Sequence, residues 1–172
     1  MRKAAAISAW SICGILAIGL VAFIVPFIGF GGGYAKVCSD AAFLYDLDIN
    51  DYKVKYQKTV RNRDGEKVQG LFRVEKDEAT IFIQTGWSRP MVIATIFHEF
   101  AHAAQYKHQL DTGKFNIEQH AEILSFYKMW HSGYRWNAIH LLPMHMIGKS
   151  AEYRATGEIA RMMFVNANPL DA

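Results

Sequence analysis

Three short stretches in the first half of the chain are predicted strands, and hydrophobic and polar residues alternate along the first of them. These stretches span residues 52–57, 68–74 and 79–84. Apolar residues at every second position are typical of half-buried strands. An Asp-Gly pair at positions 64 and 65 and the polar residues 76–78 separate the stretches, and both segments favour tight turns. Three strands joined by short turns predict an antiparallel meander.

The hydrophobic period changes to that of a helix after residue 87. Ser88 is a suitable N-cap and Pro90 a suitable first-turn residue. Apolar residues then cover a broad face from Met91 to about His108, which predicts a long helix. Other helices are predicted at residues 39–47, 116–130, 137–147 and 150–165.

The N-terminal segment is uniformly apolar. Residues 4–30 contain no charged side chain, and about 20 apolar residues suffice for a helix to span a bilayer. The run exceeds the roughly 7–15 apolar residues of a secretory signal peptide. We therefore expect residues 1–33 to form an uncleaved, single-pass membrane anchor with a glycine-rich linker, and residues 34–172 to form one domain. A cleaved signal or a buried core helix are the alternatives.

Charge gives this anchor an orientation. Arg2 and Lys3 precede the apolar run, and the positive-inside rule then places the N-terminus in the cytoplasm and the domain outside it. The expected fold class is α+β, an N-terminal transmembrane helix followed by a small domain that combines the meander with helices.

Composition narrows the possible functions. A length of 172 residues suits one domain. Two cysteines exclude a disulfide scaffold. A net charge of +3 without a basic stripe gives no support for nucleic-acid binding.

Residues 98–102 read His-Glu-Phe-Ala-His, the pattern HExxH, within the predicted long helix. His98 and His102 are four residues apart and therefore share one helix face, where both imidazoles can bind a single Zn²⁺. Glu99 can take a proton from a water molecule that zinc activates, as a general base. A chance occurrence is the alternative, but a strand, a capped turn and small apolar flanking residues surround the motif.

At residues 95–105 the sequence resembles the active-site helix of zincin metallopeptidases, and residues 79–84 resemble the edge strand that pairs with substrate in that family. The resemblance implies a zincin-like domain and a membrane-anchored zinc metallopeptidase that hydrolyses peptide bonds in a peptide or protein. The alternatives are a zincin-fold protein that holds zinc and binds or regulates a partner without proteolysis, and a structural membrane protein with a chance motif.

A catalytic zinc site needs a third protein ligand. Gluzincins, including the ImmA/IrrE-type and CAAX-processing-type peptidases, carry a glutamate followed by a small residue three positions later and Asp or Asn four positions later. Glu118, Ala121 and Glu122 resemble this pattern, although Glu122 stands where Asp or Asn is usual. Glu118 is therefore the first choice as third ligand.

Three other residues remain candidates. Glu122 lies a turn further along the same helix, and it could instead orient a ligand imidazole. Glu152 begins a second glutamate-helix pattern, with Thr156 in place of Asp. His108 has the metzincin spacing, but Gln105 stands where metzincins have the glycine that lets the chain turn back.

Overall fold

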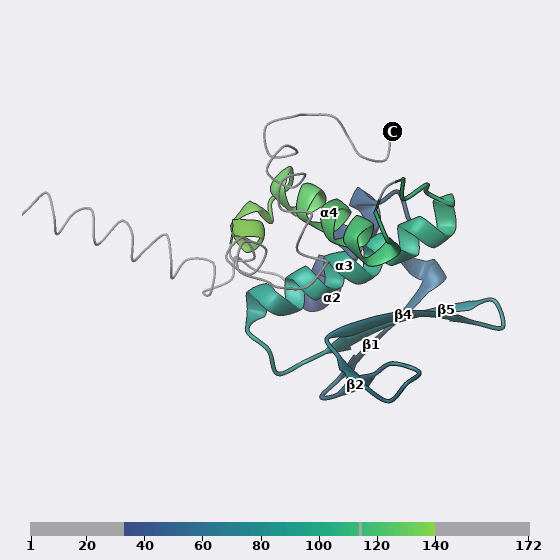
Figure 1. Cartoon of the computed structure of the whole chain (residues 1–172). Helices are drawn as coiled ribbons and strands as arrows, with labels where there is room; N and C mark the ends of the chain where they lie inside the picture. The colour runs from purple at the N-terminus through teal and green to yellow at the C-terminus, as the bar shows by residue number, and fades with distance from the viewer. Residues whose placement is uncertain (1–32, 114, 140–172) are drawn as a thin grey trace, which may run out of the picture. The chain divides into compact units, whose positions relative to one another are not determined.

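The computed structural model describes residues 33–113 and 115–139, which belong to one compact unit (Figure 1). The elements in chain order are α2 (Tyr34–Leu44), the 3₁₀ helix η1 (Ile49–Asp51), β1 (Tyr52–Gln57), β2 (Val60–Arg61), β3 (Lys67–Val68), β4 (Gly70–Glu75), β5 (Glu78–Gln84), α3 (Arg89–His108) and α4 (Ile117–Trp130).

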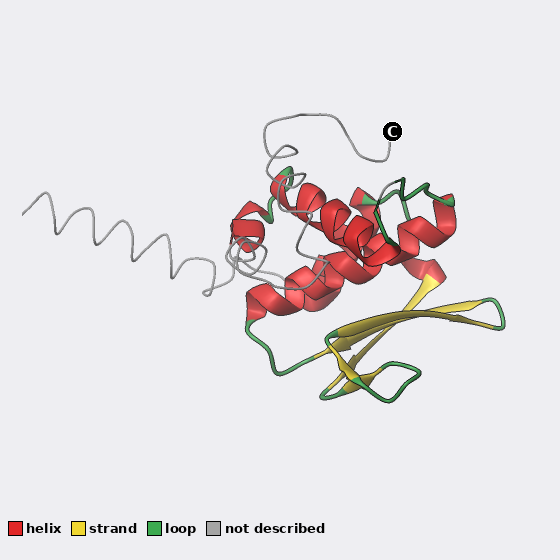
Figure 2. Ribbon diagram, viewed as in Figure 1, coloured by secondary structure: helices red, strands yellow, loops and turns green. Residues whose placement is uncertain are grey.

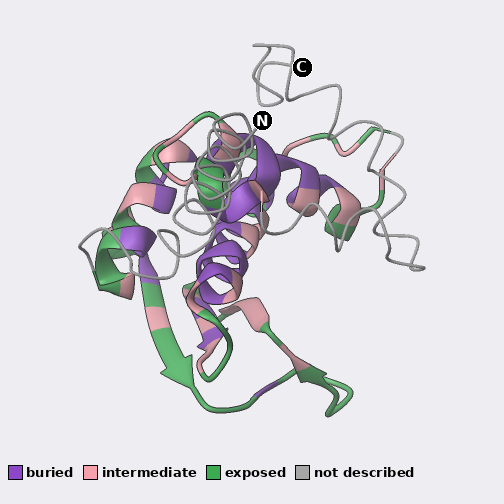
Figure 3. Cartoon of the chain, turned by 90° about the vertical axis from the view of Figure 1, so that its left-hand side faces the viewer, coloured by how far each residue is buried: buried purple, intermediate pink, exposed green. Residues whose placement is uncertain are grey.

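The helices cover one face of a small sheet (Figure 2). Helix α3 lies at the centre, because it packs against α2, α4, β4 and β5. Its residues Phe97 and Phe100 are fully buried, as are Ile81 and Ile83 of β5, and Figure 3 shows how continuous this burial is along the central helix. Burial of these side chains between the two layers provides the main stabilisation of the fold.

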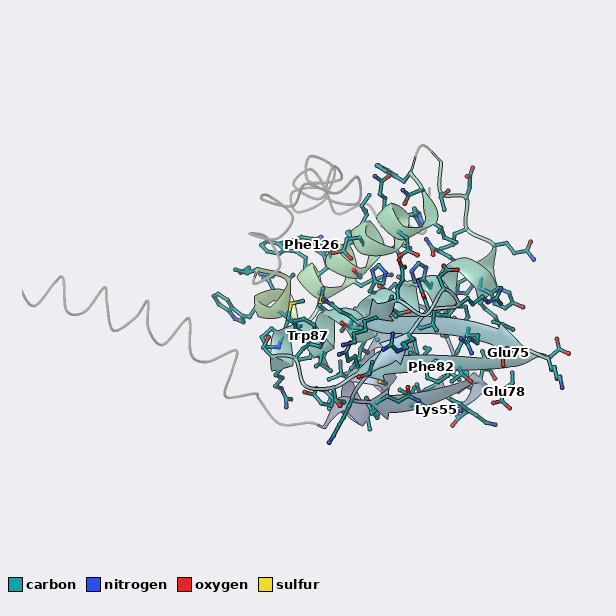
Figure 4. The ribbon with its side chains drawn as sticks, turned by 60° about the horizontal axis from the view of Figure 1, so that its bottom comes forward. Lys55, Glu75, Glu78, Phe82, Trp87 and Phe126 are labelled. Carbon is teal, nitrogen blue, oxygen red and sulfur yellow. The ribbon has the colours of Figure 1, made fainter. Side chains whose placement is uncertain are left out.

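The other face of the sheet is open to solvent (Figure 4). Phe82 lies on this face, with Lys55 Nζ 5.5 Å and Arg73 Cζ 5.7 Å from its ring centroid. Cations over an aromatic ring stabilise it and shield it from water. The alternation of β5 therefore follows the pattern of a half-buried strand, with Ile81 and Ile83 facing the helices.

The predicted antiparallel meander is wrong in its pairing. The sheet order is β1-β5-β4, with β4 antiparallel to β5 but β1 parallel to it. A two-residue turn with positive φ at Lys76 and Asp77 closes the β4–β5 hairpin. The connection from β1 to β4 is longer and contains the small β2–β3 hairpin, so it carries the chain to the far side of β5.

The two long helices have local start and stop signals. Pro90 lies in the first turn of α3, and the helix ends at Gln109, whose φ is 51°. Asn116 caps α4 with a capping box, in which its side chain accepts from the Gln119 N–H at 2.8 Å and the Gln119 side chain accepts from the Asn116 N–H at 3.3 Å. The connection between α3 and α4 is short, so the helices lie beside each other.

The expected fold class must also be corrected at the N-terminus. Among the helices of residues 33–113 and 115–139, none has both the length and the apolarity to cross a bilayer. The anchor predicted at residues 4–30, and the helices predicted at 137–147 and 150–165, lie wholly or mostly outside the described residues. The observed architecture is mixed α+β with a small sheet.

Candidate metal centre

Helix α3 presents His98 and His102 on one face, as their spacing predicts. Their Nε2 atoms lie 3.1 Å apart, and the two rings are nearly perpendicular at 85°. Both side chains are partly shielded, with exposed fractions of 22% and 13%. The two nitrogens therefore point to one position at the helix surface.

Helix α4 brings Glu118 to the same position. Glu118 Oε2 lies 3.2 Å from Nε2 of His98 and 3.2 Å from Nε2 of His102. The three atoms form a nearly equilateral triangle of potential metal ligands. Ligand atoms about 2.0–2.1 Å from a tetrahedral zinc ion lie about 3.3–3.4 Å apart, so the triangle fits a divalent cation of this size.

The contacts of the Nδ1 atoms of His98 and His102 show which tautomer of each ring suits metal binding. Nδ1 of His98 lies 2.9 Å from Oε2 of Glu122, and Nδ1 of His102 lies 2.9 Å from Oε1 of Gln105. When each Nδ1–H donates to its oxygen, each neutral ring directs an Nε2 lone pair into the triangle. Two lone pairs and a carboxylate oxygen then meet without a hydrogen between them, an arrangement that a cation stabilises.

Electrostatics favour positive charge at this position. Burial alone would lower the pKa of His98, but the Glu118 and Glu122 carboxylates overcome that effect and hold it well above its usual value. Hydrogen bonds with His102 and His98 keep the pKa of Glu118 below its usual range. A proton on the imidazoles or a divalent cation satisfies the same negative potential, and metal binding would displace the proton.

Glu99 is buried beside the triangle, with only 5% of its surface exposed. The backbone N–H of Phe72 in β4 donates to its carboxylate, and burial raises the pKa of Glu99 above its usual range. Gly70 makes this packing possible, because a Cβ there would lie 2.7 Å from Glu99 Cγ and 2.7 Å from Thr95 Cγ2 and would also collide with Glu99 Oε1. Glycine lets the strand approach the helix closely.

A pocket of about 990 Å³ opens over the triangle and Glu99. It runs between α3, the first residues of β4 and the start of α4. Besides the polar cluster, it is lined by Leu71, Phe72, Met91, Tyr106, Leu110 and Ile117. Tyr106 and Ile117 are 61% and 56% exposed, so the pocket offers apolar surface to a ligand.

Among the strands of residues 33–113 and 115–139, β4 forms the edge of the sheet at this pocket. The N–H of Gln84 donates to the carbonyl of Gln69 at 2.8 Å, and the antiparallel register alternates from there. Gly70, Phe72 and Val74 therefore direct their backbone N–H and C=O groups away from β5. The Phe72 N–H is the group that Glu99 accepts from, which agrees with this alternation.

The prediction that residues 79–84 form the substrate-pairing edge is wrong. They form β5, which lies between β1 and β4 with both of its edges paired. The edge beside the pocket is β4, because the parallel β1 occupies the other side of β5. Alternation of apolar residues does not show which strand is central.

The other candidate ligands have different positions. Glu122 contacts Nδ1 of His98, on the far side of the ring from the triangle. His108 donates from Nε2 to the backbone carbonyl of Tyr45 at 3.1 Å and takes no part in the cluster. Glu152 lies outside the described residues.

Two residues near the site were not identified from the sequence. Gln105 departs from the metzincin pattern, but its position three residues after His102 places it on the same helix face. Gly70 carried a weaker signal, since a glycine inside a strand often marks a close approach of another element.

Comparison of the chain with known protein families, curated proteins and solved structures found no match. The chemistry of the described residues therefore carries the functional conclusion.

Proposed function

We propose that this chain is a zinc-dependent peptidase of gluzincin type. The observation that carries the proposal is the convergence of His98 Nε2, His102 Nε2 and Glu118 Oε2 within 3.1–3.2 Å of one another. Two histidines and one glutamate leave an open position in a tetrahedral zinc site, which is the usual composition of a catalytic centre. The neighbouring buried Glu99 supplies the remaining group that hydrolysis needs.

Each residue has a distinct part in the proposed reaction. His98, His102 and Glu118 would hold the cation, which would supply Lewis acidity and lower the pKa of water. Glu99 accepts the proton of the attacking water on a carboxylate oxygen and passes it to the leaving amine nitrogen. The Phe72 N–H holds that carboxylate beside the triangle, and the burial that raises its proton affinity suits a general base.

The substrate would bind as an extended chain along β4. Outward-facing backbone groups of Gly70 and Val74, and the carbonyl of Phe72, can pair with a peptide backbone by strand addition. Apolar lining on both sides of the cluster, from Met91 to Ile117, favours hydrophobic side chains next to the bond that is cut. An apolar stretch of a peptide or protein is therefore the proposed substrate class.

Metal removal tests this proposal. We expect the full chain to hold about one zinc ion per molecule, to lose peptide cleavage when a chelator removes the metal, and to regain it on addition of Zn²⁺. Elemental analysis and the digestion of an unfolded, apolar-rich protein provide the measurements, with His108→Ala as the control that retains both properties. Absence of bound metal, or cleavage that survives complete removal of it, contradicts the proposal. Zinc without cleavage favours a binding or regulatory role.

Substitution of Gly70 tests the close approach of β4 to Glu99. Gly70→Ala adds a Cβ against Glu99 and Thr95, and crowding of this kind typically costs about 1–3 kcal/mol. We expect a lower denaturant midpoint together with slower cleavage, because Glu99 must move. Gly133→Ala is the matched control, since its added Cβ meets no atom within 4 Å. Equal behaviour of the two variants would show that the contact is unimportant.

A further inference from the structure

Gln105 is a buried polar residue between the two helices that carry the metal cluster. Only 6% of its surface is exposed. Its Oε1 lies 2.9 Å from Nδ1 of His102, and its Nε2 lies 2.9 Å from the carbonyl of Ile117 and 2.9 Å from Nδ1 of His120. Every hydrogen of the amide group thus has a partner, and its oxygen is directed at a metal-cluster residue.

These partners fix the orientation of the amide. The carbonyl of Ile117 can only accept a hydrogen bond, so the amide nitrogen of Gln105 must face it. The amide oxygen consequently faces His102, where it can only accept. His102 therefore carries a proton on Nδ1, and in the neutral ring this tautomer leaves the Nε2 lone pair directed towards Glu118.

The same side chain joins the two halves of the cluster. Ile117 is the first residue of α4 and directly precedes Glu118. The hydrogen bond from Gln105 to Ile117 holds the start of α4 against α3, next to His102. Buried His120, 8% exposed, closes the network by accepting the second amide hydrogen.

We propose that Gln105 is a positioning residue of the metal centre, which sets the tautomer and the ring orientation of His102 through the Nδ1–H to Oε1 hydrogen bond. The inference rests on the proposed metal site. It does not depend on the reaction that the site performs.

Metal affinity of the full chain tests the role of Gln105. Gln105→Leu removes the acceptor while keeping a similar volume. We expect its affinity for Zn²⁺, measured by competition with a chromophoric chelator, to fall about 10–100-fold, as it does when the orienting partner of a ligand histidine is lost. We also expect altered visible absorption of the Co²⁺-loaded protein, since His102 would no longer have a fixed orientation.

Gln105→Glu distinguishes an effect on the orientation of His102 from an effect on the attachment of α4 to α3. The carboxylate still accepts from His102. Both hydrogen bonds that the amide donates, to the Ile117 carbonyl and to His120 Nδ1, are lost, because neither carboxylate oxygen donates. We expect this variant to recover most of the Zn²⁺ affinity and the wild-type Co²⁺ absorption. Gln57→Leu, the same chemical change at an exposed position of β1 that does not line the pocket, is expected to match wild type.

Two results would overturn the inference. One is a Zn²⁺ affinity of Gln105→Leu equal to that of the wild-type chain. The other is an equal loss of Zn²⁺ affinity in Gln105→Leu and Gln105→Glu, which would assign the effect to the hydrogen bond that holds the start of α4 against α3. A failure of the proposed peptidase function gives a different result. The variants would then keep the expected order of Zn²⁺ affinities, but neither they nor the wild-type chain would cleave peptide. A wild-type chain that binds no Zn²⁺ or Co²⁺ would overturn both.

Discussion

Glu99→Gln is expected to reduce peptide cleavage by about 10²–10⁴-fold, the usual contribution of a general acid–base group, with the zinc content unchanged. The amide has the shape of the carboxylate and its oxygen can still accept from the Phe72 N–H, so β4 and α3 remain together. It cannot take a proton from water at neutral pH. The turnover number on an apolar-rich peptide and the zinc stoichiometry of the same sample give the two measurements.

Glu75→Gln is the matched control for this substitution. Glu75 ends β4 with its side chain 66% exposed, where it pairs with Arg73, and Figure 4 shows it at the far end of the sheet. Its turnover number should equal that of the wild-type chain. If Glu99→Gln also turned over at the wild-type rate, Glu99 would not be the base and the proposed mechanism would be wrong.

Alanine substitutions at Glu118 and Glu122 should have different effects on metal binding. Glu118 Oε2 lies 3.2 Å from both imidazole Nε2 atoms, so Glu118→Ala removes a proposed ligand and should eliminate stoichiometric zinc. Glu122 contacts Nδ1 of His98 rather than an Nε2 atom of the triangle. Glu122→Ala should therefore weaken zinc binding by about 10–100-fold, as is typical when an orienting carboxylate is lost.

His108→Ala serves as the control for both variants, because His108 contacts the Tyr45 carbonyl and not the cluster. Zinc affinity by chelator competition, measured on the three variants together, ranks them. If Glu122→Ala lost more zinc affinity than Glu118→Ala, Glu122 would be the ligand and Glu118 the orienting carboxylate. A loss in His108→Ala would return it to the set of candidate ligands.

Local signals account for the parts of the fold that the sequence predicts well. The strand at residues 52–57 has the predicted bounds, and the long helices begin and end within two residues of their predicted positions. Helix caps, a proline in the first turn and the spacing of apolar residues depend on neighbouring residues only, so they can be read from the sequence. Helix α2 begins at Tyr34, five residues before its predicted start, because its N-terminal residues offered no cap signal.

Non-local geometry accounts for what the sequence could not predict. A period of two identifies β1 as a strand but gives no information on its parallel pairing with β5. Likewise, His98 and His102 meet because of helix geometry alone. The choice between Glu118 and Glu122 depends on how far α4 is shifted along α3, which the packing of the two helix surfaces decides.

The bond between Glu99 and the Phe72 N–H has a consequence for solubility. Exposed strand edges are templates on which other chains add and aggregate, and proteins protect them with charges or by covering them. Glu99 places a carboxylate on the free edge of β4 and occupies one of its donors, while Gly70 lies against α3. We therefore expect Glu99→Ala to lose the proposed base and also to leave the Phe72 donor open to pairing with another chain.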